Sequence, residues 1–178
     1  NYTNTRHNIG FKIIDAINTH FKLSKQKPKF KGLLTTGNID EKKIYAIKPL
    51  TFMNNSGTAI KELIDYFKID AKNVIVFHDD MDIDFGKIKA KFGGSSAGHN
   101  GIESIDKFIG KDYSRVRIGI GHPKQKKKVN NHVLEDFKED EEERIKEITE
   151  NIVKQIPTLI DKKIDLFSSK VNQNLNGI

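Results

Sequence analysis

Apolar residues that recur every three or four positions predict helices in several parts of the chain. In the first of these helices, Ile9, Ile13, Ile17 and Phe21 fall on one face. The last begins with acidic residues, as the helix dipole favours, and is expected to break or kink at Pro157. The predicted helices are residues 8–22, 58–67, 101–109 and 136–164.

Short apolar or alternating runs predict strands between these helices. Residues 74–77 read VIVF between polar neighbours, which is typical of a strand buried on both faces. The predicted strands are residues 32–39, 43–47, 74–77, 87–92 and 116–120. Strands that alternate with helices predict an α/β fold, here a single-domain three-layer sandwich over residues 1–178 with a twisted mixed sheet flanked by helices. The Asn- and Ser-rich residues 168–178 are expected to form a frayed tail.

The segment FGGSSAGHNGI, residues 92–102, joins a predicted strand to a predicted helix. It has almost no apolar side chain to contribute to a core, and its glycines let a ligand approach the backbone closely. Gly and Ser N–H groups near a helix start can also bind phosphate or ribose oxygens. We therefore expect a ligand-binding loop here, with a mobile surface loop as the alternative.

Composition narrows the classes of function. The net charge is +7 and the isoelectric point about 9.4, which points to a polyanionic partner, first of all nucleic acid. A Lys-rich background composition is the alternative. The absence of Cys excludes disulfides and thiolate zinc sites and favours a cytoplasmic location. No apolar run approaches the roughly 18–20 residues of a membrane span, so no membrane partner is expected.

His7 and Asp79 are the candidate catalytic pair. A helix N-terminus disfavours imidazolium, which leaves a neutral His7 ring able to act as a base. Asp79 follows a predicted buried strand, where a carboxylate can hold the Nδ1–H of a histidine. Without a Cys or a nucleophile elbow, such a pair indicates a base that activates water. A capping role for His7 and a turn role for Asp79 are the alternatives.

The acidic segment after the same strand offers a competing, metal-dependent hypothesis. Asp80, Asp82 and Asp84 occupy the first three ligand positions of a calcium-hand loop. The template then fails, because Phe85 stands where Gly is needed and Lys91 where a bidentate Glu is needed. The six histidines show no metal-ligand spacing either. No cofactor is therefore expected, and a metal-dependent hydrolase is the less favoured alternative.

Two asparagines and two aromatic residues are candidates for substrate binding. Asn54 and Asn100 lie in predicted loops before helices, where an amide can bind a carbonyl, an ester or a ribose hydroxyl. Helix capping is the alternative role. Phe52 and Tyr2 can offer aromatic surfaces to a base, although a loop Phe is more often part of the core.

Five segments resemble, in order and spacing, the signatures of bacterial peptidyl-tRNA hydrolases. They are TRHNIGF (5–11), PLTFMNNSG (49–57), HDDMDIDFG (78–86), KFGGSSAGHNGIESI (91–105) and RVRIGIGHP (115–123). The resemblance covers most of residues 2–135. It implies a monomeric α/β enzyme that hydrolyses the ester between a peptide and the 3′-terminal ribose of tRNA. An RNA-binding domain without catalysis is the alternative.

The resemblance also implies residue roles. By motif position, His7 matches the general base and Asp79 its partner. For direct hydrolysis by water, we further expect the amide of Asn54 to stabilise the oxyanion. The residues that match substrate-binding positions are Asn54, Asn100, Phe52 and Tyr2. We further expect tRNA phosphates to meet Lys89, Lys91, Arg115 and residues 124–128, with binding that weakens as salt rises.

One departure from the family concerns the start of the chain. Family members begin with a buried strand and a G-N-P-G turn just before the tyrosine matched by Tyr2, and the sequence here begins at Asn1. The Asn of that turn helps the family to distinguish peptidyl-tRNA from aminoacyl-tRNA. We expect that this segment belongs to the protein and is missing from the sequence.

Overall fold

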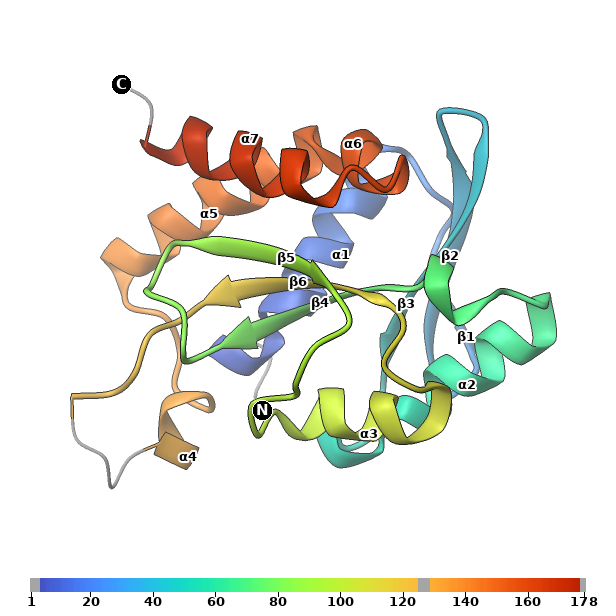
Figure 1. Ribbon diagram of the computed structural model, residues 1–178, viewed down its shortest axis with the longest axis horizontal. Helices are drawn as coiled ribbons and strands as arrows, with labels where there is room; N and C mark the ends of the chain where they lie inside the picture. Colours follow the sequence, from blue (N-terminus) through green and yellow to red (C-terminus); the bar gives the residue numbers. More distant parts are fainter. Residues whose placement is uncertain (1–3, 125–128, 177–178) are drawn as a thin grey trace. The chain divides into compact units, whose positions relative to one another are not determined.

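A computed structural model describes residues 4–124 and 129–176 (Figure 1). The packing divides the chain into two compact units. The first consists of Asn1–Ala16, Phe77–Lys91 and Arg115–Ile178, and the second of Ile17–Val76 and Phe92–Ser114. Among the described residues, no helix combines the length and the apolar character that crossing a bilayer requires.

The first unit is built on a three-stranded sheet in the order β4-β6-β5. The arrows of β4 and β6 point the same way in Figure 1 and that of β5 points the opposite way, so the sheet is mixed. The elements of this sheet are β4 (Ile75–Asp80), β5 (Ile88–Phe92) and β6 (Ser114–Gly119). The helices are η1 (Arg6–Asn8), the first part of α1 (Ile9–His20), α4 (Val129–His132), α5 (Glu139–Lys154), α6 (Ile156–Ile160) and α7 (Ile164–Asn176).

Helix α1 lies directly against β4. A Cβ atom at Gly10 would collide with the backbone carbonyl oxygen of Phe77, so only glycine permits this approach. Ile9 and Ile13, on the same helix, are fully buried. This close packing brings the start of α1, just after His7, next to the strand that carries Asp79.

Helix α7 covers β5 and corrects the expectation of a frayed tail. Phe167 and Val171 are fully buried. The Asn172 side chain donates to the Ile88 carbonyl oxygen at 2.7 Å and accepts from the Ile88 N–H at 3.1 Å, as a neighbouring strand would. Ser168 Oγ accepts from the Ala90 N–H at 2.9 Å. The prediction was wrong for residues 168–176, because the Asn- and Ser-rich composition conceals the apolar spacing.

The second unit joins an antiparallel sheet to two helices. Its sheet has the order β1-β2-β3, with Leu34 opposite Ile47. Helices α2 and α3 pack closely, since Gly57 N–H donates to Ser104 Oγ at 2.9 Å and a Cβ at Gly57 would collide with the Ser104 carbonyl oxygen. The elements are β1 (Lys27–Lys29), β2 (Gly32–Ile39), β3 (Lys42–Pro49), η2 (Met53–Asn55), α2 (Ser56–Phe67), η3 (Ala71–Asn73) and α3 (Asn100–Ile109). The buried core residues are Leu34, Ile60, Leu63, Ile64, Ile102, Ile105 and Tyr113.

The predicted α/β fold with a mixed sheet and flanking helices is confirmed. The predicted break near Pro157 is also confirmed, because α5 ends at Lys154 and Pro157 stands in the first turn of α6. The short strand β1 lies between the predicted helix 8–22 and the predicted strand 32–39, where the sequence analysis predicted neither a helix nor a strand. The expectation of a single domain stays a prediction.

Candidate active site

His7 and Asp79 meet in the first unit. His7 lies in the turn η1, immediately before α1, and Asp79 lies near the end of β4. His7 Nδ1 is 2.8 Å from Asp79 Oδ1. The His7 side chain is 16 % exposed and that of Asp79 is 3 % exposed. The structure therefore brings together two residues that are 72 positions apart in the sequence.

This contact selects one form of the His7 ring. A carboxylate only accepts hydrogen bonds, so the proton of a neutral His7 lies on Nδ1 and Nδ1–H donates to Asp79. The lone pair of the neutral ring is then on Nε2. The buried carboxylate also stabilises the imidazolium that forms when Nε2 takes up a proton. An imidazole held in this way can act as a general base.

The aspartates beyond Asp79 are held by separate partners. Asp80 Oδ2 accepts from Arg117 Nε at 2.8 Å, and Asp80 Oδ1 accepts from the Asp82 N–H at 2.8 Å. Asp82 Oδ1 is 2.8 Å from His122 Nε2. Asp84 is 86 % exposed and 3.7 Å from a lysine ammonium. Because these carboxylates face different cations and backbone groups, the metal-dependent alternative is not favoured.

The second unit carries Phe52, Asn54 and Asn100 at its surface. Phe52 is 87 % exposed, and Asn54, in η2, is exposed as well. Asn100 is the exposed first residue of α3. The elements η2 and α3 pack together, since a Cβ atom at Gly101 would lie 2.7 Å from the sulfur of Met53. The two asparagine-bearing segments thus lie side by side within this unit.

His99 is a capping residue that the sequence analysis missed. Its Nδ1 accepts hydrogen bonds from the N–H groups of Gly101 and Ile102, at 3.1 and 3.2 Å, and so caps α3. The capping role considered for Asn100 therefore belongs to its neighbour, and the exposed Asn100 amide can meet a ligand. The sequence feature that could have predicted this capping role is the position of His99 between a Gly-rich loop and an apolar helical pattern.

The expected phosphate-binding residues divide into two groups. Lys89 and Lys91 are exposed and two positions apart on β5, so they share one face of the strand. Lys124 is exposed. Arg115 is 1 % exposed at the start of β6, so its guanidinium is not available to a phosphate at the surface, and this expectation is corrected. Tyr2 and residues 125–128 lie outside the described residues.

Comparison with known proteins identifies the family. The family model described as peptidyl-tRNA hydrolase matches residues 1–177. The peptidyl-tRNA hydrolase of Pelagibacter ubique (strain HTCC1062) is 74 % identical over 95 % of this chain and 91 % of its own length. That of Bartonella henselae is 45 % identical over 99 % of this chain and 91 % of its own.

The fold agrees with this relationship. The crystal structure of peptidyl-tRNA hydrolase from Acinetobacter baumannii superposes with a TM-score of 0.89 at 31 % identity, covering 96 % of this chain and 88 % of that one. A non-catalytic RNA-binding domain is not favoured by these matches. The chain therefore belongs to the peptidyl-tRNA hydrolase family and is an enzyme that hydrolyses peptidyl-tRNA.

Proposed function

We propose that the enzyme cleaves the ester between the peptide and the 3′-terminal ribose of tRNA by direct attack of a water molecule that His7 activates. The observation that carries this proposal is the 2.8 Å contact between His7 Nδ1 and the buried Asp79 carboxylate. His7 Nε2 removes a proton from water as its oxygen attacks the ester carbonyl. The reaction then passes through a tetrahedral oxyanion, with no covalent enzyme intermediate and no metal ion.

The breakdown of this intermediate uses the same histidine. As the carbon–oxygen bond to the ribose breaks, the protonated His7 returns its proton to the 3′ oxygen of the tRNA. The products are the free peptide acid and tRNA. Asp79 stays ionised throughout and holds the imidazolium in place between the two proton transfers.

Asn54 and Asn100 are assigned by their motif positions and their exposure. The amide of Asn54 donates to the oxyanion, and one such donor typically contributes about 3–4 kcal/mol to transition-state stabilisation. Asn100 holds the ribose or the end of the peptide through the donor and acceptor of its amide. Phe52, with most of its ring exposed, provides a surface for the terminal base. We further propose that the enzyme acts as a monomer in the cytoplasm.

The test is the release of labelled N-acetylaminoacyl groups from tRNA, with and without EDTA. We expect equal rates in both conditions, because water is activated by an imidazole. If EDTA inactivates the enzyme and added Mg²⁺ or Zn²⁺ restores activity, the mechanism is contradicted. That result would favour a metal-dependent hydrolase that uses Asp80, Asp82 and Asp84. Binding of the substrate without release of the label would contradict the assignment of a hydrolase.

Lys89 and Lys91 are proposed to bind tRNA phosphates. The Lys89→Ala, Lys91→Ala double variant is expected to raise KM and leave kcat unchanged, because the lost contacts are made equally in the ground and transition states. The plot of the logarithm of the tRNA association constant against the logarithm of the salt concentration should become shallower by about 1.5, which corresponds to two fewer released counterions. Filter binding of tRNA at several salt concentrations measures this slope.

The control removes two other exposed lysines, Lys146 and Lys154 on α5. This variant changes the net charge of the protein by the same amount. Equal effects of the two variants would show that only overall charge matters, and would contradict a specific role for β5.

A further inference from the structure

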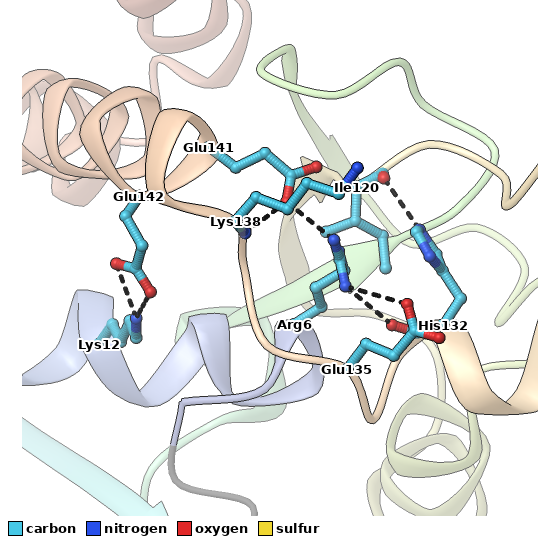
Figure 2. A network of polar contacts seen from close by, with 8 residues as sticks. All are labelled: Arg6, Lys12, Ile120, His132, Glu135, Lys138, Glu141 and Glu142. Atoms are coloured by element: carbon cyan, nitrogen blue, oxygen red, sulfur yellow. Dashed lines mark hydrogen bonds and ion pairs between the residues drawn. The ribbon is translucent and has the colours of Figure 1, made fainter.

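A network of polar contacts holds the turn that carries His7 (Figure 2). At its centre is Arg6, the residue before His7, whose side chain is only 3 % exposed. Arg6 Nη2 donates to Glu141 Oε2 at 2.8 Å, and Arg6 Nη1 lies 3.7 Å from Glu135 Oε2. The guanidinium also lies over the ring of Phe137, 5.4 Å from its centroid. A buried, charged side chain is thus enclosed by the segment that leads into α5.

The backbone of the same turn is held by the same segment. His7 N–H donates to the Val133 carbonyl oxygen at 2.8 Å, and Arg6 N–H donates to the Glu135 carbonyl oxygen at 3.0 Å. Thr5 forms an antiparallel bridge with Asp136. The backbone position of His7 therefore depends on residues 133–136, while the Nδ1–H of its ring donates to Asp79.

Glu141 connects this turn to a rigid element. It lies in the first turn of α5, and its Oε2 accepts from the Lys138 N–H at 2.8 Å as well as from Arg6. The preceding segment is also anchored at its other end, because His132 Nε2 contacts the Ile120 carbonyl oxygen at 3.2 Å. One carboxylate oxygen thus joins the start of α5 to the residue beside the general base.

We propose that the Arg6–Glu141 ion pair is a positioning device that sets the orientation of His7 toward Asp79. This inference rests on the proposed role of His7. Arg6 and Glu141 are positioning residues, since neither touches the reacting atoms. A misplacement of a catalytic group by about 1 Å can cost about a hundredfold in rate, so a smaller displacement of His7 is expected to lower kcat measurably. Loss of Glu141 also removes the 2.8 Å partner of the buried Arg6 guanidinium and leaves it the longer, 3.7 Å contact with Glu135.

The chain offers a matched control one residue away. Glu142 follows Glu141 in α5, and its Oε1 pairs with Lys12 Nζ at 3.2 Å, on α1 rather than on the His7 turn (Figure 2). Glu141→Gln and Glu142→Gln are the same substitution in the same helical turn. In Glu141→Gln, the amide oxygen of the new side chain can still accept from the Lys138 N–H, so the helix cap is retained while the ion pair with Arg6 is lost.

The experiment measures kcat, KM and the nitrogen NMR signals of the His7 ring in both variants. We expect Glu141→Gln to lower kcat about tenfold with KM within about twofold, and to shift the His7 Nδ1 signal. Glu142→Gln should change neither kcat nor the His7 signals. Arg6→Lys, which keeps the charge but loses the planar fork, should lower kcat in the same direction as Glu141→Gln.

Two results would overturn the inference. One is equal kinetics of the two glutamine variants, and the other is a fall in kcat with unchanged His7 ring signals. The NMR readout also separates this inference from the proposed function. If a His7→Ala variant kept its activity while Glu141→Gln shifted the His7 signals, the general-base assignment would fail and the positioning contact would stand.

Discussion

His7→Ala is expected to lower kcat for N-acetylaminoacyl-tRNA by about 10²–10⁴-fold, the usual contribution of a placed general base. In the proposed mechanism, His7 Nε2 takes the proton of water, because Nδ1–H donates to Asp79 at 2.8 Å. Without the imidazole, water must attack without a base, and the ribose oxygen must leave without an acid. KM should change little, since the ring acts on water rather than on the bound tRNA.

The measurement is single-turnover hydrolysis with saturating enzyme, which separates chemistry from product release. His20→Ala is the control, because His20 is exposed at the end of α1 and distant in sequence from the pair. Thermal unfolding of both variants checks that the fold is retained. A His7→Ala enzyme with most of its activity would show that another group activates the water.

Asp79→Asn is expected to have the second large effect, again about 10²–10⁴-fold in kcat. Asparagine has nearly the same shape as aspartate, so the packing around this 3 % exposed side chain is preserved. Its amide can donate to His7 Nδ1, which moves the ring proton to Nε2 and removes the lone pair that should accept from water. The substitution also removes the negative charge that stabilises the imidazolium.

The control for this substitution is Asp84→Asn, five positions along the chain, where the side chain is 86 % exposed. It should leave kcat unchanged. Nitrogen NMR of the His7 ring reports the tautomer directly. We expect the proton on Nδ1 in the unsubstituted enzyme and on Nε2 in Asp79→Asn. Retention of full activity together with the shifted tautomer would contradict the proposed direction of proton transfer.

Much of the site was predictable because its residues stand at points that local sequence can recognise. The apolar run VIVF predicts a strand, and Asp79 comes two residues after it. The apolar spacing of residues 9–21 predicts a helix that begins just after His7. That His7 and Asp79 form a pair was only a hypothesis from their residue types and positions. The folded chain provides the contact itself, at 2.8 Å.

The errors have a common physical cause. Arg115 and Arg117 stand two positions apart on β6, and the local sequence does not distinguish them. In the structure, Arg115 is 1 % exposed, whereas Arg117 pairs with Asp80. Likewise, residues 168–176 look like a polar tail until Val171 and Asn172 are seen to engage the core of their unit and β5. Local patterns report periodicity, and they do not report which surface another part of the chain covers.

Short-range spacing and the order of the motifs were enough to predict the α/β class, most of the helices and strands, the candidate base with its partner, and the family. The capping of α3 by His99, the burial of Arg115 and the enclosure of Arg6 by the segment before α5 became visible only in the folded chain. The enclosure of Arg6, for example, depends on a contact between residues 135 positions apart. Such contacts form only when the core closes, and no local pattern encodes them.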